Sequence, residues 1–396
     1  MAVEPVPTVP ALGAEPQALV ETVQRLAQDR FAARAARYDA ESAFPAENYA
    51  DLRAAGLLGL SIPKAYGGQG ADSLTYAKCL LEMAKGCSAT ALTFNMHATV
   101  LTFIAALGTE AQKRRYFGDV VRDGRLMASI TSEPESSFRD KFVMQTVFKP
   151  VPGGYQVSGV KQFCSLGDSA DYYFVSGIQE GSTTAKEGLL SALIRRTDPG
   201  VKIEGTWNAM GMRGTVSHTI RYETFVEDEQ IIGPPAGLFT IDLSGFALGY
   251  SATYLGIGEA ALDYILDFVR TKTIRPSTEP LGHHPVTQRT IAEMATAVRA
   301  ARLLLYEAAR VRDSGDRAAA MLAVNQSKYL SAETGVMVTE RAIRLAGGRG
   351  ILRDLPLERW HRDAMAGPVM PPSSDRCLET AGKLLCGLEA KTLDFQ

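Results

Sequence analysis

The sequence lacks the features that mark several large classes of protein. Its five cysteines are scattered, no Cys-x-x-Cys pair occurs, and no Cys and His residues cluster at ligand spacing, so we expect reduced thiols and no metal site. The net charge of -2 gives no electrostatic reason to expect nucleic acid as a partner. No run of about 18 apolar residues occurs, and the first residues lack the basic and apolar regions of a signal peptide. We therefore expect a cytoplasmic protein without a membrane span.

Two glycine patterns that bind nucleotides are also missing. No G-x-G-x-x-G motif follows a predicted strand and opens a helix, and no P-loop is present. Strands and helices do not alternate along the chain as they do in a doubly wound sheet. These absences argue against a Rossmann fold and against a P-loop nucleotide-binding protein.

The chain is long enough for two or three domains, with 396 residues and a hydrophobic content of 46%. Closely spaced prolines predict a flexible leader over residues 1–16. Apolar residues at helical spacing, with Gly and Pro at the helix ends, predict an all-helical domain over residues 17–125. Its helices are expected at residues 18–36, 45–58, 74–85, 89–107 and 111–122.

The pattern changes after residue 125. Short alternating or β-branched runs, separated by Gly, Pro and Asp, predict a compact β domain over residues 126–235. Its strands are expected at residues 142–148, 155–159, 172–175, 190–194 and 219–223. Helical spacing returns over residues 236–396, with long helices expected at residues 248–272, 285–314, 316–345 and 374–390. Four long helices with short connections predict an antiparallel bundle, so the fold class is α+β.

Six blocks of the sequence, taken in order, resemble the acyl-CoA dehydrogenase family of flavoproteins. The blocks are Phe44–Gly68, Thr131-Ser132-Glu133-Pro134, Gly159–Ser165, Met210–Thr215, Ala342–Gly350 and Leu357–Ala364. The resemblance implies an all-helical N-terminal domain, a central β domain and a C-terminal four-helix bundle, with FAD between the β domain and the bundle. It also implies a homotetramer or homodimer, because in this family a second subunit usually completes the FAD site.

The same resemblance implies which residues bind FAD. Phe163 would pack against the isoalloxazine ring and Ser165 would donate toward N5, because the ring needs donors along its polar edge. At Gly347 a partner chain would approach the pyrophosphate with no side chain in the way. The complete set of candidate cofactor-binding residues is Thr131, Ser132, Phe163, Ser165, Arg275, Arg344, Gly347, Gly348, Ser373 and Ser374. Without the resemblance, the hydroxyls satisfy loop backbone, Gly347 ends a helix, and a serine caps the last helix.

The sequence departs from the family where the catalytic carboxylate is expected. Dehydrogenation needs a base within hydrogen-bond reach of the proton α to the thioester. The two positions at which family members carry that glutamate hold Pro371 and Phe246, which become candidate substrate-binding residues. The candidate displaced carboxylates are Asp375, Glu135 and Asp242, although each also fits the role of a helix cap or a solvated charge.

Three functions stay open at this point. The first is an FAD-dependent oxidoreductase that performs α,β-dehydrogenation, or a variant of it, on an acyl thioester with the help of an electron-transfer partner. Because Ala247 replaces an arginine common in the family, the thioester is carried either by CoA or by a carrier protein. The second is a flavin-dependent monooxygenase of the same fold, which needs no α-proton base. The third is a non-catalytic partner subunit of a hetero-oligomeric dehydrogenase.

Overall fold

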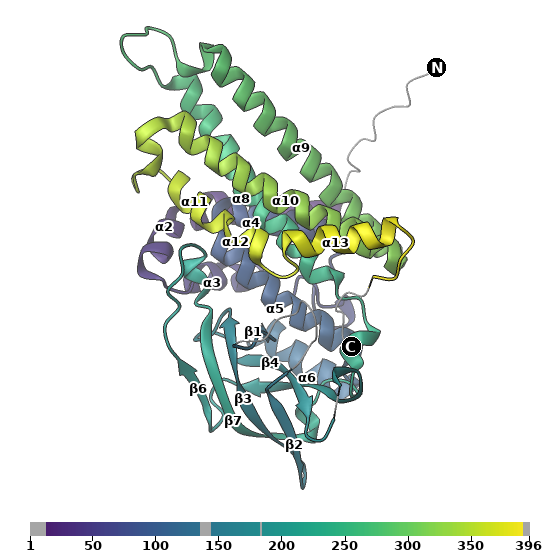
Figure 1. Ribbon diagram of the computed structural model, residues 1–396. Coiled ribbons are helices and arrows are strands. Elements are labelled where there is room, and N and C mark those ends of the chain that lie inside the picture. Colours follow the sequence, from purple (N-terminus) through teal and green to yellow (C-terminus); the bar gives the residue numbers. More distant parts are fainter. Residues whose placement is uncertain (1–12, 135–143, 183, 391–396) are drawn as a thin grey trace.

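The computed structural model describes residues 13–134, 144–182 and 184–390 of the chain. Figure 1 shows a β domain at one end of the molecule and helices at the other, with a long helical arm pointing away from the sheet. N-terminal and C-terminal helices pack against each other above the sheet, and one hydrophobic core runs through both helical parts and the β domain. The expected fold class and the order of helical, β and helical domains are confirmed.

The N-terminal part is helical throughout. Its elements are α1 (Ala14–Leu26), the π-helical turn η1 (Ala27–Phe31), α2 (Ala32–Glu41), α3 (Ala46–Ala54), α4 (Ser73–Gly86), α5 (Ser88–Leu107) and α6 (Glu110–Val121). Helix α6 begins with a capping box, in which Thr109 and Gln112 exchange side-chain and backbone hydrogen bonds. The η1 turn joins α1 to α2, so the helix expected at residues 18–36 is one continuous element over residues 14–41.

Helix α5 lies in the core of the molecule. Among the described residues it is the one helix long and apolar enough to cross a membrane, and 78% of that stretch is buried inside the protein, as in a core helix. Its buried His97 accepts a hydrogen bond from the N–H of Met127 and contacts the carbonyl oxygen of Leu58, each at 3.0 Å. Burial lowers the pKa of His97 to about 4, so a neutral imidazole ties α5 to the first strand.

The β domain is a seven-stranded sheet. The strands are β1 (Met127–Ile130), β2 (Val147–Val151), β3 (Gly154–Cys164), β4 (Tyr172–Gln179), β5 (Leu189–Arg195), β6 (Val201–Glu204) and β7 (His218–Glu227). Their order is β1-β4-β2-β3-β7-β6, with β5 on the other edge of β4. Strands β1 and β2 both pair in parallel with β4, one along its first half and one at its end. The chain therefore leaves the sheet after β1 and rejoins the same edge at β2.

Two features of the sheet differ from expectation. The strand expected at residues 142–148 begins at Val147, since the N–H groups of Gln145 and Thr146 bind the carboxylate of Glu133 instead of a strand, at 2.6 and 3.0 Å. Residues 142 and 143 lie outside the described part of the chain. Strands β1 and β6 have four residues each, too few for an alternating pattern to reveal them.

The C-terminal part contains the four long helices that were expected, together with two short ones. Its helices are α8 (Ser244–Thr271), α9 (Pro285–Asp313), α10 (Arg317–Ala346), α11 (Leu357–Ala364), α12 (Ala366–Val369) and α13 (Ser374–Leu385), and the single turn α7 (Ala185–Gly188) precedes β5. The 3-10 turn η7 (Gly347–Ile351) follows α10. Helix α13 ends at Leu385, five residues earlier than expected, and a left-handed Gly387 with φ of 71° follows it.

Glycines let α8 pass closely between two neighbours. A Cβ atom at Gly256 would lie 2.5 Å from the carbonyl oxygen of Leu81 on α4, and one at Gly335 of α10 would lie 2.6 Å from the carbonyl oxygen of Tyr254 on α8. Neither distance is tolerable for a side chain, so both positions require glycine. This packing sets the first turns of α8 beside the N-terminal helices, where Asn95 of α5 donates to the carbonyl oxygen of Phe246 at 2.9 Å.

Candidate functional site

The first element of the candidate site is the loop that leaves the sheet after β1. The N–H of Gln162 donates to the carbonyl oxygen of Ser132 at 2.9 Å, which places this loop beside the end of β3. Below it, the buried Lys161 ammonium lies 2.6 Å from the buried carboxylate of Glu133 and donates to the carbonyl oxygen of Thr131 at 3.2 Å. Burial raises the pKa of Glu133, but Lys161 and backbone N–H groups outweigh it and hold this pKa below its usual value. An ionised buried pair therefore fixes the loop.

Next to this loop, β3 ends in an exposed aromatic side chain. Phe163 has φ of 56° and is 60% exposed, and its ring meets Trp207 edge to face at a centroid distance of 6.1 Å. Positive φ is costly for a bulky residue, and surrounding structure must hold it there. The strained backbone turns an apolar, planar side chain outward at the same corner of the β domain as Thr131 and Ser132.

Two residues further on, the hydroxyl of Ser165 points into the protein. Its Oγ lies 3.0 Å from Oγ of Ser217, which lies 2.7 Å from Oγ1 of Thr215. Thr215 in turn donates to the carbonyl oxygen of Met212 at 2.8 Å. All three hydroxyl residues are buried, so this line of hydroxyls is shielded from solvent.

The second element of the candidate site is the segment between α12 and α13, which points toward the β domain in the view of Figure 1. Lys328 of α10 is fully buried beneath it, and its Nζ donates to the carbonyl oxygens of Gly367 at 2.6 Å and Met370 at 3.1 Å. The ammonium also lies 5.9 Å from the ring centroid of Tyr254. Burial lowers the pKa of Lys328 to about 8. A lysine therefore anchors the segment through backbone carbonyls.

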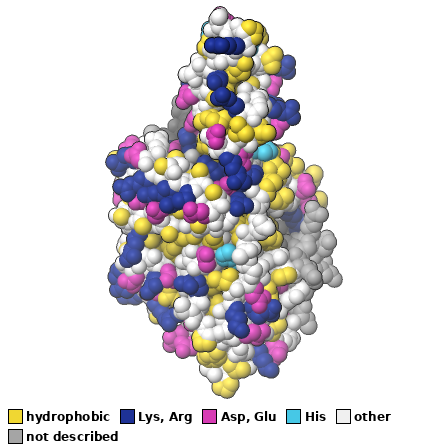
Figure 2. Space-filling model, turned by 90° about the vertical axis from the view of Figure 1, so that its left-hand side faces the viewer, with side chains coloured by type: hydrophobic (Ala, Val, Ile, Leu, Met, Phe, Trp, Pro, Cys, Tyr) yellow, Lys and Arg dark blue, Asp and Glu magenta, His cyan; other side chains and the backbone are white. Residues whose placement is uncertain are grey.

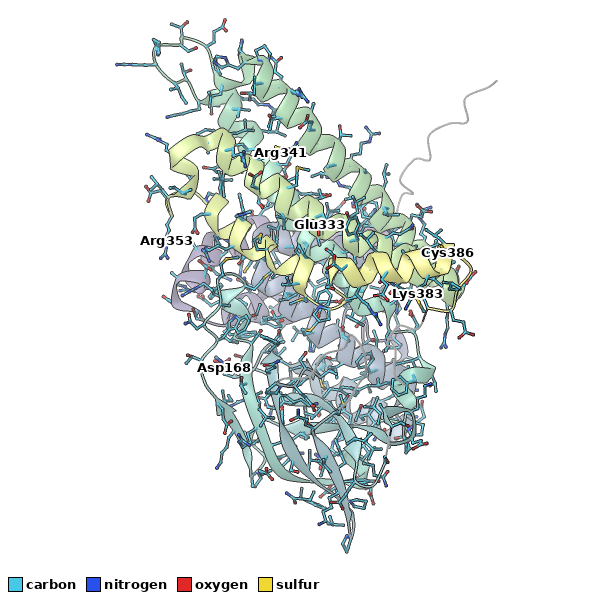
Figure 3. The ribbon with its side chains drawn as sticks, in the orientation of Figure 1. Asp168, Glu333, Arg341, Arg353, Lys383 and Cys386 are labelled. Atoms are coloured by element: carbon cyan, nitrogen blue, oxygen red, sulfur yellow. The ribbon has the colours of Figure 1, made fainter. Side chains whose placement is uncertain are left out.

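Further contacts hold the later part of the same segment. The thiol of Cys377 donates to the carbonyl oxygen of Pro372 at 3.5 Å, and the hydroxyl of Ser374 donates to Glu333 at 2.6 Å. Figure 3 labels Glu333, which lies on α10. Ser373 is the N-cap of α13 and accepts from the N–H of Arg376. The capping role expected for one of these serines thus belongs to Ser373, and Ser374 ties α13 to α10.

Helix α11 joins the three domains through charged side chains. Arg362 makes two hydrogen bonds to Asp39 of α2, at 2.9 and 2.6 Å, and a third to the carbonyl oxygen of Met210 at 2.9 Å. The hydrogen bonds that Arg362 donates to Asp39 raise the pKa of Arg362. Next to it, the buried carboxylate of Asp363 accepts from the hydroxyl of Ser88 and from a backbone N–H. The Arg-Asp-Ala block is therefore a junction between domains in this structure.

Family models match the chain in the order of its domains. The model of the acyl-CoA dehydrogenase N-terminal domain matches residues 13–123, that of the middle domain matches residues 128–225, and that of the C-terminal domain matches residues 248–369. The chain belongs to the acyl-CoA dehydrogenase family. It is a flavoprotein oxidoreductase, and FAD is the usual cofactor of this family.

Individual relatives cover nearly the whole chain. It is 29% identical over 373 residues to acryloyl-CoA reductase (NADH) from Anaerotignum propionicum, covering 92% of this chain and 93% of the relative. It is 28% identical over 362 residues to dibenzothiophene monooxygenase from Rhodococcus erythropolis, covering 85% and 86%. The structure of butyryl-CoA dehydrogenase from Megasphaera elsdenii is similar with a TM-score of 0.89 at 24% identity, covering 95% of this chain and 99% of that one.

The candidate cofactor residues of this family member fall into separate groups. Thr131, Ser132, Phe163 and Ser165 share one corner of the β domain, whereas Ser373 and Ser374 begin α13. Arg344 pairs with Glu340 on its own helix, and Gly347 and Gly348 follow in η7 with open space where a Cβ would lie. Arg275 is exposed in the loop between α8 and α9, at the tip of the arm in Figure 1. Within one chain, the arm that carries Arg275 points away from the β domain.

The candidate carboxylates differ in how they are engaged. Asp242 accepts two hydrogen bonds from Ser244, at 2.8 and 2.9 Å, and lies 2.9 Å from Nε of Arg312, so it forms a cap and an ion pair at the start of α8. Asp375 is exposed in the first turn of α13 and has no ion pair or hydrogen-bond partner for its side chain in the described part of the chain. Glu135 lies outside the described residues.

The two family positions for glutamate are apolar in this structure. Phe246 is half-buried in the first turn of α8, with its ring 5.7 Å from that of Tyr250. Pro371 is exposed between α12 and α13. Neither side chain can accept a proton, so any base for this site is supplied from another position.

Three residues that shape the site were not predicted from the sequence, namely Lys161, Lys328 and Ser217. A signal existed for Lys328, which lies on the same helix face as Val324 and Ala332, because a lysine within an apolar stripe is unusual. For Ser217 no signal existed, since its partner Ser165 is 52 residues away along the chain.

Proposed function

We propose that this chain is an FAD-dependent oxidoreductase that acts on an acyl thioester, carried by CoA or by a carrier protein. In this proposal the isoalloxazine ring lies between the corner formed by Thr131, Ser132 and Phe163 and the segment between α12 and α13. Two buried lysines, Lys161 and Lys328, hold these elements from beneath. Such rigid support for flexible segments is what a cofactor site needs.

The β-domain corner fits a flavin ring chemically. The hydroxyls of Thr131 and Ser132 are half-buried and have no hydrogen-bond partner among the described residues, so they are available to polar atoms of the ring. Phe163 offers an exposed planar surface beside them. When bound, the flavin supplies the hydride acceptor, and the residues of the chain position the acyl group and remove its α proton.

Asp375 is the base that we propose for this proton. It is the one candidate carboxylate within the described residues whose side chain has no partner there, and it lies four residues beyond Pro371. The first turn of α13 is anchored through Ser373 and Ser374, which holds the carboxylate at the segment that faces the proposed site. This availability of Asp375 is the observation that carries the proposal, since Asp242 is paired with Arg312.

The first prediction tests substrate class and base together. FAD-loaded protein, mixed anaerobically with saturated acyl-CoA thioesters, is expected to lose the absorbance of oxidised flavin. Replacing Asp375→Asn should slow this reduction about 100-fold or more, because general-base catalysis contributes on this order. Asp354→Asn, at another exposed aspartate, is the matched control and should reduce at the unchanged rate. An Asp375→Asn variant that reduces as fast as the parent protein eliminates Asp375 as the base.

A flavin-dependent monooxygenase is the second candidate function. The observation in its favour is the apolar pair Phe246 and Pro371 at both family positions for glutamate, which suits chemistry without α-proton removal. Its signature is flavin that stays oxidised with every thioester, together with a hydroxylated product when a reductase and oxygen are supplied. If the flavin is not reduced by any thioester and no hydroxylated product forms, a non-catalytic partner subunit is favoured.

We also propose that the functional unit is a homo-oligomer. The 28 residues of α8 make it about 42 Å long, so Arg275 at the tip of the arm cannot serve a ring at the corner of its own β domain. Figure 2 shows Lys and Arg side chains gathered over this protruding end. The η7 turn exposes Ile351 at 70% and the adjacent Leu352 at 49%, as expected for a contact surface. We infer that a second copy brings these groups to the cofactor, in a cytoplasmic tetramer or dimer.

A further inference from the structure

The line of hydroxyls behind Ser165 determines the direction of its hydrogen bond. The line contains three short contacts: Ser165 to Ser217 at 3.0 Å, Ser217 to Thr215 at 2.7 Å, and Thr215 to the carbonyl oxygen of Met212 at 2.8 Å. Each contact joins two oxygen atoms, so each needs one proton between them. Three hydroxyls supply three protons, because a carbonyl oxygen supplies none.

Only one assignment of protons satisfies all three contacts. The proton between Thr215 and the carbonyl of Met212 must come from Thr215. The contact between Ser217 and Thr215 must then use the proton of Ser217, and the contact between Ser165 and Ser217 must use that of Ser165. The hydroxyl of Ser165 therefore donates inward, and only its lone pairs are left for a ligand.

We propose that Ser217 and Thr215 are positioning residues that make Ser165 a hydrogen-bond acceptor toward flavin N5, and that the site thereby favours the reduced cofactor. This inference rests on the flavin placement proposed above. Oxidised flavin has an unprotonated N5, which accepts hydrogen bonds, whereas reduced flavin carries an N5–H that donates. An acceptor at Ser165 matches the reduced ring and leaves oxidised N5 without a donor from this residue.

Donation from Ser165 to oxidised N5 would leave one contact in the line without a proton. The contact that is least costly to lose is the one between Thr215 and the carbonyl of Met212, because the indole N–H of Trp207 also donates to this carbonyl at 2.9 Å. The preference of the site for reduced over oxidised flavin is therefore about the free energy of one hydrogen bond, or on the order of tenfold in relative affinity. In this proposal Ser165 accepts from N5–H, whereas the resemblance to the family implies that it donates toward N5.

The second prediction concerns the reduction potential of the bound flavin, measured by equilibrium reduction with a reference dye in the complete protein. Ser217→Ala removes the inward partner and frees the proton of Ser165 for oxidised N5. The potential should become more negative, by about tenfold in relative affinity or about 30 mV for a two-electron couple. Ser165→Ala should also make it more negative, because the acceptor for N5–H is lost.

Two further variants distinguish a change in hydrogen bonding from a folding defect. Thr215→Val frees the proton of Ser165 by another route, since Ser217 can then donate to Ser165, and it should shift the potential in the same direction as Ser217→Ala. Ser191→Ala breaks a buried hydroxyl pair of the same kind, Ser176 with Ser191 at 2.9 Å, elsewhere in the sheet. This control should leave the potential unchanged.

The sign of the change in reduction potential shows whether Ser165 accepts from N5–H or donates to oxidised N5. A potential that rises in Ser165→Ala shows that Ser165 donates to oxidised N5, and overturns the proposal. Potentials in Ser165→Ala and Ser217→Ala that equal the Ser191→Ala control overturn it as well. The measurement needs flavin but no substrate. A protein whose flavin is reduced by no thioester would contradict the proposed function, but its reduction potential could still be measured.

Discussion

In the β domain, the buried Lys161 faces the carboxylate of Glu133 at 2.6 Å, whereas in the bundle the buried Lys328 faces only backbone carbonyls in its hydrogen bonds. Both lysines lie beneath a segment that borders the proposed cofactor site, and both donate to carbonyl oxygens of that segment. One loop is therefore fixed by an ammonium in direct contact with a carboxylate, and the other by an ammonium whose hydrogen bonds go to carbonyl oxygens, with the charge of Glu333 as a weaker support.

The difference affects how each region responds to its surroundings. Burial lowers the pKa of Lys161 as well, but the carboxylate of Glu133 opposes this shift, and the pKa of Glu133 is itself held below its usual value. Carbonyl dipoles and an aromatic ring stabilise an ammonium less than a carboxylate does, so the pKa of Lys328 is lowered to about 8. The β-domain loop is thus held by two groups that stabilise each other's charge, while the contact of α10 with the segment before α13 includes an ammonium with a pKa of about 8.

The largest effect is expected from breaking the pair in the β domain, the third prediction. Lys161→Met removes the ammonium that lies 2.6 Å from the buried carboxylate of Glu133, which should lower the free energy of unfolding by about 3–5 kcal/mol. The measurement is urea denaturation followed by circular dichroism. The double variant Lys161→Met with Glu133→Gln removes both charges and should recover part of the loss. A loss below about 1 kcal/mol in the single variant would contradict a compensated pair.

A smaller, pH-dependent effect is expected for Lys328, the fourth prediction. Between pH 8 and the ordinary lysine pKa of 10.5, the unfolded state holds a proton on Lys328 that the folded state has released. The unfolded state binds more protons, so the stability contributed by this residue rises with pH. The free energy of unfolding of the parent protein, minus that of Lys328→Met, should increase by about 2 kcal/mol from pH 8 to pH 10.

Urea denaturation of both proteins at each pH provides this difference and cancels the groups they share. Lys202→Met, at an exposed lysine on β6, is the control and should give a difference that does not change with pH. A difference for Lys328→Met that does not change with pH would mean that the pKa of Lys328 is not lowered in the folded protein, and would contradict the proposed weakness of its carbonyl partners.

The smallest effect is expected at the end of the segment, the fifth prediction. Ser374→Ala removes the 2.6 Å hydrogen bond to Glu333. It should lower the free energy of unfolding, measured by urea denaturation, by about 1–2 kcal/mol, because the acceptor is charged. Glu333→Gln keeps an acceptor oxygen in place and should cost less. If Ser374→Ala is neutral, the anchoring of α13 depends on Lys328 and the N-cap alone.

Much of the architecture was predictable from sequence because the signals are local. Apolar spacing over residues 89–107 predicted α5 at its observed end, and alternation over residues 219–223 lies within β7. Six ordered blocks predicted the family, which the domain matches confirm. The site assignments for Thr131, Phe163 and Asp375 stay predictions, since they depend on where a bound flavin and substrate lie.

What the sequence by itself determined is the order of the domains, the family and the absence of a glutamate at residues 246 and 371, because each of these depends on residue types at given positions. Only the tertiary structure decided that Lys161 and Lys328 are buried beneath the two loops, that Asp242 is paired with Arg312, and that Ser165 and Ser217 are in contact. The physical reason is separation along the chain: Lys328 and Gly367 are 39 residues apart, and Ser165 and Ser217 are 52 residues apart. Contacts between residues this far apart form only on folding, so no local sequence pattern predicts them.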